Sequence, residues 1–288
     1  MLLAGVLSLT LVGPAASMPA STLKSAPVAS YTVTSFNVLG SSHTPVGGSR
    51  APGTTRIVWA NRLLERHGVD VAGFQEMQYD QLTKFLEITE GEWAVYPGFQ
   101  LRRRDTENSI GWRTDLFDLV EARTIDITYF DGNLRPMPVV LLRHKATGLT
   151  TWFANFHNPA DTKLHPNQGY WRRKATATEI ALAKELRGQN GPVVITGDMN
   201  SRAWYFCRMA LNAPMKAARP TSYVRNGVCH PNKPRAVDWI FGSRLLSFTH
   251  YVEDRSALVA KTTDHPMIVS DMTVDGARTP SAVTPVTP

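Results

Sequence analysis

Alternating apolar and polar positions mark several short strands along the chain. Residues 31–40, "YTVTSFNVLG", alternate apolar with small polar side chains, whereas residues 69–77, "VDVAGFQEM", form a mostly apolar run. Period-two alternation is typical of a half-buried strand, and a short apolar run is typical of a strand buried on both faces. The same reasoning predicts strands or hairpins at 92–98 and 109–122, two antiparallel strands within 138–159 joined at "KATG", and strands at 193–200, 236–243, 246–254 and 265–272.

Two segments show helical spacing instead. Residues 55–68 place apolar side chains on one face and end at Gly68, and residues 169–190 carry a longer stripe that ends in "GQNGP". A glycine after the last apolar position is a common helix stop because it adopts the left-handed conformation without strain. The stripes comprise Ile57, Ala60 and Leu64 in the first segment and Ala175, Thr178, Leu182 and Leu186 in the second. Strands that alternate with a few helices predict an α/β domain with a layered sheet core.

The two ends of the chain differ in composition from the rest. Residues 1–20 are an apolar run followed by small residues and proline, which is typical of a secretory signal, although no Lys or Arg precedes the run. The run is too short to span a bilayer comfortably. We therefore expect a secreted, extracellular protein with a linker at 21–30, one folded domain over 31–275 and a disordered Pro- and Thr-rich tail at 276–288.

Charge and cysteine content narrow the class of protein. The chain carries 31 Lys and Arg against 24 Asp and Glu, a formal net charge of +7, which favours polyanionic partners such as nucleic acid or anionic lipid head groups. Its two cysteines, Cys207 and Cys229, fit one disulfide in an exported protein, the alternative being two unpaired buried thiols. Their spacing is not that of a zinc site.

Polar residues stand at or near the ends of the predicted strands. In "VVITGDMNS", residues 193–201, a strand delivers a carboxylate and an amide at its end. Each such residue has an ordinary explanation as turn chemistry, a cap or a salt bridge. Together they describe oxygen ligands and two histidines at strand ends, where the loops of α/β folds build functional sites. The set comprises Asn37, Glu76, His157, Asp198, Asn200, Asp238, Asp264 and His265.

Six short motifs, in order along the chain, resemble those of the endonuclease/exonuclease/phosphatase superfamily. They are "SFNVLG", "VAGFQEMQ", "NFHNP", "GDMNS", "VDWIF" and "TDHPMIV", and "NSIGWRTDLF" is similar to the family's central strand. The resemblance covers nearly the whole chain after the predicted signal. It implies a four-layer α/β sandwich of two packed mixed β-sheets flanked by helices. It also implies metal-dependent hydrolysis of a phosphoester.

The resemblance assigns tasks that phosphoester hydrolysis requires. Glu76 is expected to bind the metal, with Asn37 and Asp264 contributing; Mg²⁺ is the expected ion, with Mn²⁺ or Ca²⁺ as alternatives. His265 is the candidate general base and Asp238 its orienting partner, while Asp198 orients the attacking water or acts on it. Donors to the phosphate and the leaving group complete the site. The predicted phosphate-binding residues are Asn37, Asn108 and Asn200, with His157 as a further donor that Asn108 or Glu107 orients.

The substrate has to be read from the loops, because the fold alone does not choose it. The basic runs "LRRRD" (101–105) and "YWRRK" (170–174) mix cations with aromatic residues and favour a nucleic acid, unless they are solvated faces. A sphingomyelinase-like phospholipid diesterase is the alternative, with "RAWYF" (202–206) as a membrane-inserting loop. A phosphomonoesterase and an inactive binding module on the same scaffold are further candidates. No obligate protein partner is expected, and a monomer is predicted.

Overall fold

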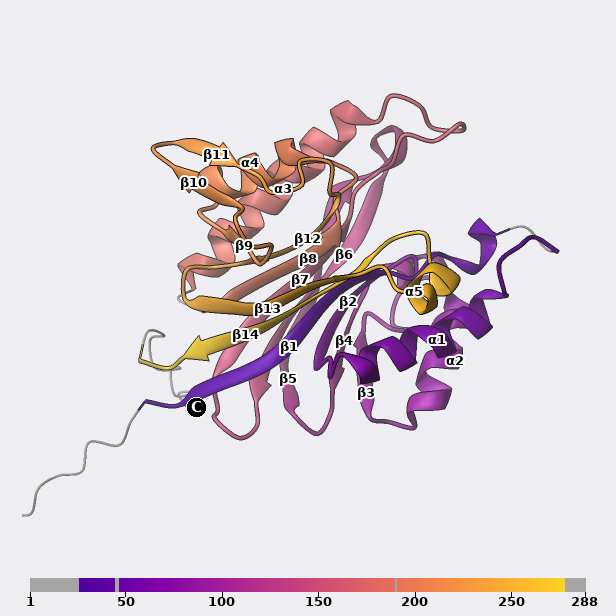
Figure 1. Ribbon diagram of the computed structural model, residues 1–288, viewed down its shortest axis with the longest axis horizontal. Helices are drawn as coiled ribbons and strands as arrows, with labels where there is room; N and C mark the ends of the chain where they lie inside the picture. The colour runs from indigo at the N-terminus through magenta and orange to yellow at the C-terminus, as the bar shows by residue number, and fades with distance from the viewer. Residues whose placement is uncertain (1–25, 45–46, 190, 278–288) are drawn as a thin grey trace, which may run out of the picture.

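Two six-stranded sheets stack face to face, and helices cover the outer face of each (Figure 1). The computed structural model describes residues 26–44, 47–189 and 191–277. The predicted signal at 1–20, part of the linker and most of the tail lie outside the described residues. The layers confirm the predicted four-layer α/β sandwich with two mixed sheets.

The first sheet joins the beginning of the described chain to its end. Its strand order is β13-β14-β1-β2-β4-β3, in which β1 pairs antiparallel with β14 and parallel with β2. The strands are β1 (Val28–Asn37), β2 (Val71–Gln75), β3 (Trp93–Tyr96), β4 (Ser109–Arg113), β13 (Leu246–Asp254) and β14 (Met267–Asp275).

The second sheet is built from the middle of the chain. Its order is β5-β6-β7-β8-β12-β9, with β7 and β8 parallel and β12 antiparallel to β8. The strands are β5 (Phe117–Thr128), β6 (Leu134–His144), β7 (Thr150–His157), β8 (Val193–Asp198), β9 (Lys216–Ala217) and β12 (Asp238–Gly242), and a separate hairpin pairs β10 (Tyr223–Arg225) with β11 (Val228–His230).

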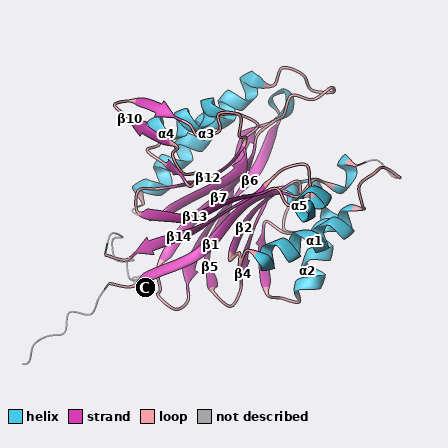
Figure 2. Cartoon of the chain, viewed as in Figure 1, coloured by secondary structure: helices cyan, strands magenta, loops and turns pink. Residues whose placement is uncertain are grey.

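The helices divide between the two outer faces, as Figures 1 and 2 show. On the first sheet lie α1 (Gly53–Arg66), α2 (Tyr79–Thr89) and α5 (Ala257–Thr262); on the second lie α3 (Gly169–Gly188) and α4 (Ala203–Asn212). Three short 3-10 turns, η1 (Ser41–His43), η2 (Arg103–Glu107) and η3 (Phe130–Gly132), lie in the connections. Within the described residues, no helix is long and apolar enough to cross a membrane.

Three apolar clusters hold the layers together. One lies between the sheets and contains Val33 and Ile240, a second packs the second sheet against α3 and α4, and a third packs the first sheet against α1, α2 and α5. Strands buried on both faces read as continuous apolar runs, which is why β2 and β8 were recognisable from the sequence. Each fully buried Phe or Leu contributes roughly 1.5–3 kcal/mol.

Near one edge, the layer between the sheets turns polar. Gln75 Nε2 donates to Asn155 Oδ1 at 2.6 Å, and Thr196 Oγ1 donates to the same oxygen at 3.0 Å. A Cβ atom on Gly73 would collide with Thr196 and Asn155, so only glycine lets the sheets approach this closely here. This hydrogen-bonded polar layer separates the apolar core from the strand ends.

Three helices, α2, α4 and α5, were not predicted. Residues 79–89 form α2, whose first turn is closed by a capping box in which Gln78 N donates to Gln81 Oε1 at 3.1 Å. Leu82 and Phe85 are fully buried one turn apart, but this short stripe is broken by polar residues. Residues 203–206 lie in α4 and not in a loop, and Tyr205 and Phe206 pack into the core.

The segment 109–122 contains two strands, as expected, but they do not pair with each other. β4 belongs to the first sheet and β5 to the second, so the chain crosses between the layers within a few residues. The antiparallel partner of β4 on its outer side is β3. The two strands within 138–159 do pair antiparallel, as β6 and β7.

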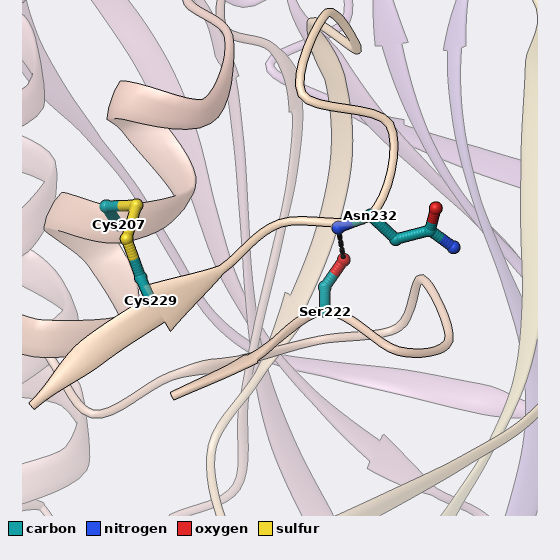
Figure 3. Close-up of a disulfide and its surroundings, with 4 residues drawn as sticks. All are labelled: Cys207, Ser222, Cys229 and Asn232. Atoms are coloured by element: carbon teal, nitrogen blue, oxygen red, sulfur yellow. Dashed lines mark hydrogen bonds between the residues drawn. A yellow bond between two sulfur atoms is a disulfide. The ribbon is translucent and has the colours of Figure 1, made fainter. Parts of the chain in front are cut away.

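The two cysteines form a disulfide, as expected. Cys207 on α4 is bonded to Cys229 on β11, with their Cα atoms 5.4 Å apart (Figure 3). On the same segment, Asn232 N donates to Ser222 Oγ at 3.0 Å. Together these contacts tie the β10–β11 hairpin to α4 and to the chain that leads into β12.

Candidate active site

Polar residues predicted at strand ends meet at one edge of the stacked sheets. β1 and β2 run parallel, with Asn37 opposite Gln75, and β7 and β8 run parallel, with His157 opposite Asp198. β12 runs antiparallel to β8 and begins where β8 ends, which places Asp238 opposite Asp198. Strand register therefore brings side chains together that are far apart in the sequence.

Asp198 lies at the centre of this group. Asn37 Nδ2 donates to Asp198 Oδ2 at 3.2 Å, and the Nε2 atoms of His157 and His265 lie 3.7 and 3.5 Å from the same oxygen. Asp198 is only 1% exposed, so its charge interacts with these groups in a partly desolvated setting. We call Asn37, Glu76, His157, Asp198, Asp238 and His265 the strand-end cluster.

Glu76 follows β2 in the left-handed conformation, with φ +61°. Its Oε1 accepts from Asn37 Nδ2 at 2.9 Å, and its Oε2 accepts from His43 Nδ1 at 2.6 Å and from Gly40 N at 3.1 Å. Burial alone would raise the pKa of Glu76, but the bond from His43, the nearby His157 and the Asn37 amide together lower that pKa well below its usual range. Glu76 is therefore ionised at neutral pH.

His265 is held by Asp238, the partner predicted for it. His265 Nδ1 lies 3.0 and 3.2 Å from the two oxygens of Asp238, and its Nε2 faces Asp198. Burial lowers the pKa of His265, but the charges of Asp238 and Asp198 and the bond to Asp238 raise it to about 10. The two carboxylates therefore favour the protonated form of the His265 ring in this arrangement.

Asn200 lies beside Asp198 in the turn after β8, which ends at Asp198. Asn200 has φ +43°, its backbone N donates to Asp198 Oδ1 at 3.0 Å, and its side-chain Nδ2 donates to Asn158 O at 2.8 Å. Asn200 therefore has both a turn role and a site role. Its backbone holds the Asp198 carboxylate, and its side chain lies on the pocket surface.

Asp264 lies beside the strand-end cluster and not within it. It is exposed, and its described hydrogen bond is with Thr263 Oγ1 at 3.4 Å, whereas Thr263 Oγ1 also donates to Asn37 O at 2.7 Å. The charge of Asp264 reaches the cluster and contributes to raising the pKa of His265. The described contacts thus do not join Asp264 to Glu76 or Asn37 as a shared ligand set.

Asn108 is fully buried and does not line the pocket. Among the described residues neither atom of its side-chain amide has a hydrogen-bond partner, and the same is true of His157 Nδ1. The alternative orienting residue, Glu107, accepts from Arg135 at 2.6 Å instead. The expectation that Asn108 or Glu107 orients His157 is therefore not met by the geometry.

Sequence reasoning missed Arg56 and His43. Arg56 is fully buried on α1 and donates to the carbonyl oxygens of Val38, Leu39, Gly40 and Thr262. These bonds fix the segment after β1, which carries His43 towards Glu76. An arginine within an amphipathic helix looks like a surface residue in sequence, so no local signal distinguished it.

An open pocket of about 930 Å³ lies over the strand-end cluster. Two further segments line it: 129–135, which runs from the end of β5 into the start of β6, and 160–168 before α3. We call them the loop wall. The residues that line the pocket from the loop wall are Tyr129, Phe130, Asn133, Leu134, Arg135, Ala160, Thr162, Lys163, Leu164 and His165. The pocket has room for more than a phosphate group.

The two basic runs have different places in the structure. Arg104, from the run 101–105, lines the pocket. The run 170–174 does not line it; Lys174 Nζ lies over the rings of Tyr170 and Trp171, 4.9 and 5.4 Å from their centres. Trp171 packs against Gly132 and so supports the loop wall from behind.

A family model described as "Endonuclease/Exonuclease/phosphatase family" matches residues 34–270. The chain belongs to this family. The match begins in β1, ends in β14 and includes every residue of the strand-end cluster. The protein is accordingly a metal-dependent hydrolase of phosphoric esters. No curated protein sequence matches the chain.

Several solved structures share the fold. An endonuclease/exonuclease/phosphatase from Bacteroides vulgatus is 17% identical, with a TM-score of 0.68 over 86% of this chain and 100% of that chain. The human Nocturnin catalytic domain with bound sulfate is 14% identical, with a TM-score of 0.66 over 86% and 97%. A mannosyl-6-phosphatase of Bacteroides thetaiotaomicron is 21% identical, with a TM-score of 0.62 over 84% and 99%. At these identities the likeness shows the fold alone.

The donors of the strand-end cluster fit the divalent metal that the family uses. Glu76 Oε1 and Asp198 Oδ2 both accept from Asn37 Nδ2 and both lie within 4 Å of His157 Nε2, so two carboxylates line the same part of the pocket. Hard divalent cations prefer such oxygen ligands. Asp198, Asp238 and His265 also offer ligand atoms within 4.8 Å of one another, but His265 Nδ1 is already bonded to Asp238. Glu76, which is ionised and lines the pocket, remains the first candidate for a metal ligand.

Proposed function

We propose that this protein is a Mg²⁺-dependent phosphodiesterase that hydrolyses nucleic acid by attack of water on the phosphorus. One observation carries the proposal: a single carboxylate oxygen of Asp198 is surrounded by Asn37, His157 and His265 at the base of an open pocket. A carboxylate among hydrogen-bond donors suits a reaction in which one group takes a proton while others stabilise new negative charge.

Each residue then has a chemical task. A divalent cation held by the Glu76 carboxylate would neutralise charge on the phosphoryl oxygens. Asp198 orients the attacking water and accepts its proton. His157 and Asn200 donate hydrogen bonds to the phosphoryl oxygens.

His265 takes a different task from the one predicted. A neutral general base was expected, but a ring with a pKa of about 10 is protonated at neutral pH. We therefore assign His265 the donation of a proton towards the developing negative charge. Asp238 holds the ring in place and keeps it protonated.

Charge supports nucleic acid as the substrate. The chain has a net charge of +7, and Arg104, Arg135 and Lys163 line the pocket around the strand-end cluster. Cations that flank a scissile phosphate can bind the neighbouring phosphates of a chain and position it without reading its sequence. A phosphodiester with further phosphates on either side fits this arrangement.

The phospholipid alternative loses its main support. Of the aromatic residues in 202–206, Tyr205 and Phe206 are fully buried against Phe241, and only Trp204 is partly exposed, at 41%. A membrane-inserting loop needs several exposed apolar side chains together. The inactive-module alternative is also weaker, because the strand-end cluster is assembled and not merely present in the sequence.

We further propose that the protein is exported. Support comes from the Cys207–Cys229 disulfide, because disulfides persist in oxidising compartments. The predicted signal lies outside the described residues, so only its amino-acid composition supports export. Recovery of the protein from the culture medium of its source cells, without residues 1–20, would test this proposal.

The catalytic proposal is tested with a panel of substrates. The purified protein is incubated with bis-p-nitrophenyl phosphate, single-stranded and duplex DNA, RNA and sphingomyelin vesicles, with Mg²⁺, Mn²⁺, Ca²⁺ or EDTA. We expect cleavage of bis-p-nitrophenyl phosphate and nucleic acid that EDTA abolishes and Mg²⁺ restores. Hydrolysis of sphingomyelin alone, or activity that EDTA leaves intact, would overturn the proposal.

Site variants test the assignment to this pocket. Glu76→Gln, His157→Ala, Asp198→Asn and His265→Ala should each lower the rate at least ~10²-fold, as expected for loss of a charged catalytic group. Asp118→Asn is the control, because Asp118 is exposed on β5 and pairs only with Lys145 among the described residues. Near-wild-type rates in two of the four site variants would show that the roles are wrong.

A further inference from the structure

We propose that the loop wall binds an unpaired base next to the phosphate being cleaved, so that the enzyme acts on single strands in preference to duplexes. This inference rests on the proposed function and adds the form of the nucleic acid. The pocket, at about 930 Å³, is near the upper end of ligand sites, which run from roughly 300 to 1,000 Å³. A phosphate would fill only the part over the strand-end cluster, so the rest has room for a flanking group.

Two stacked rings form the surface of the loop wall. Phe130 and His165 lie nearly parallel, 4.6 Å between centres and 17° between planes, and we call them the ring platform. His165 Nδ1 bonds to the Asp131 carboxylate, whose other oxygen accepts from Gln168 Nε2 at 2.8 Å. Gln168 is buried, and its Oε1 accepts from Asp131 N at 2.9 Å. The two segments of the wall are thus locked together before any ligand binds.

Ring contacts connect the ring platform to the strand-end cluster. Tyr129 packs edge-to-face against His157, with ring centres 6.1 Å apart, and against Phe130, with centres 4.5 Å apart. Tyr129 is buried, so its two neighbours have fixed positions relative to each other. A group attached to a phosphate at His157 can therefore lie along this row of rings and reach Phe130 or His165.

The rim of the wall is apolar and cationic together. Leu134 and Leu164 are 62% and 87% exposed, which is unusual for side chains of this size. Arg104, Arg135 and Lys163 line the same pocket, and the Arg135 guanidinium lies 4.8 Å from the centre of the Tyr129 ring. Flat apolar surface beside positive charge is the chemistry that binds a nucleotide, since bases stack on rings while phosphates pair with cations.

The ring platform favours an unpaired base for a geometric reason. In a duplex each base face is covered by its neighbours, and exposing one face costs a few kcal/mol of stacking and pairing. A single strand presents its base faces at much lower cost, and each base stacked on an aromatic ring contributes about 1–3 kcal/mol. A lipid fits less well, because the Asp131 carboxylate interrupts the apolar surface at the platform.

The test compares a ring variant with a missing base. Phe130→Leu keeps an apolar side chain and removes the ring. We measure kcat/KM with Mg²⁺ on one labelled oligonucleotide in three forms: single strand, duplex, and single strand with abasic residues on both sides of the cleaved phosphate. Phe130→Leu should lower kcat/KM about 10-fold on the intact single strand and leave the abasic strand unchanged. Wild type should prefer the single strand to the duplex by a similar factor.

A second stacked pair outside the pocket provides the matched control. Tyr223 on β10 and His230 on β11 lie 4.7 Å apart with planes at 21°, almost as Phe130 and His165 do. Tyr223→Leu should change none of the three rates, and thermal melting should show that both variants are folded.

The outcomes separate the two proposals. Equal wild-type cleavage of single strand and duplex, or an equal loss by Phe130→Leu on intact and abasic strands, overturns the base-binding inference and leaves nuclease activity standing. No cleavage of any oligonucleotide, with active hydrolysis of another phosphoester, overturns both.

Discussion

The strand-end cluster and the loop wall face each other across one pocket but are built in different ways. The cluster stands on paired strands, and Asp198, its centre, is 1% exposed. The loop wall consists of connections, and Leu164 on it is 87% exposed. A side chain on a paired strand is placed by sheet register and core packing, whereas one on a loop is placed by a few local hydrogen bonds. We therefore expect the catalytic residues, which must be placed accurately, to lie in the strand-end cluster. The residues that select the substrate are expected in the loop wall.

The largest effect is expected when the His265–Asp238 pair, part of the strand-end cluster, is changed. His265→Gln and Asp238→Asn should each lower kcat by about 10²–10³-fold with little change in KM, because the pair acts on charge that develops during reaction. His250→Gln is the matched control: His250 Nδ1 lies 3.1 Å from Asp271 Oδ2 in a similar pair outside the pocket. Steady-state kinetics measure both constants. A large rise in KM with unchanged kcat would instead place the pair in substrate binding.

A second test concerns the buried support behind the cluster. Glu179 on α3 is fully buried, and burial raises its pKa to about 7, while Tyr205 and Asn158 oppose that rise only in part. A carboxyl whose folded-state pKa lies above the unfolded value of 4.5 costs stability as pH rises between the two values. Glu179→Gln should therefore stabilise the protein more at pH 8 than at pH 5, by about 2–3 kcal/mol. Urea unfolding at both pH values measures the difference.

The Glu179→Gln variant also tests whether the buried groups behind the cluster affect the catalytic rate. Asn158 follows His157 in the chain, and its carbonyl accepts a hydrogen bond from Asn200. Displacement of Asn158 would therefore move His157 and Asn200. Because Gln keeps the shape of Glu, kcat should stay within about twofold of wild type. Glu185→Gln is the control for α3, since Glu185 is exposed. A pH dependence of stability that Glu179→Gln leaves unchanged would exclude Glu179 as its source.

Removal of the disulfide should affect stability and spare both parts of the pocket. Cys207 and Cys229 are separated by 22 residues, and loop-closure reasoning assigns such a crosslink about 3 kcal/mol. The double variant Cys207→Ala, Cys229→Ala should lose stability of this order, with unchanged kcat and KM at a temperature where it is folded. Wild type treated with reductant should melt like the variant. A loss of activity in the folded variant would show that the hairpin reaches the site.

The smallest effect is expected within the loop wall itself. Asp131 holds the His165 ring against Phe130, so Asp131→Asn should loosen the ring platform and keep both rings. We expect KM for a single-stranded oligonucleotide to rise about threefold with unchanged kcat, less than the loss of a stacking ring. Asp126→Asn, at an exposed position on β5, is the control. A fall in kcat would instead show that the loop wall also affects catalysis by the strand-end cluster.

Much of the cluster was predictable because its residues stand where local patterns end. Strands such as β2 and β8 read as apolar runs, and the polar residue after each run was visible without a structure. Asn37, Glu76, His157 and Asp198 were found in this way, as were Asp238 and His265 in two later strand segments, and the family motifs gave these residues their expected tasks. The helices α2 and α4 were missed because their apolar stripes are short and become helical mainly through burial against a sheet.

Local patterns in the chain predict the fold class, most of the strands and the polar residues at their ends, because periodicity and turn chemistry act between near neighbours. The tertiary structure alone places Asp198 between His157 and Asp238, leaves Asp264 and Asn108 outside the cluster, and buries the arginine that fixes the segment after β1. It also decided the ring platform, in which Phe130 and His165 meet from two loops. Such contacts depend on strand register and loop closure between distant segments, and those long-range interactions leave no local pattern in the chain.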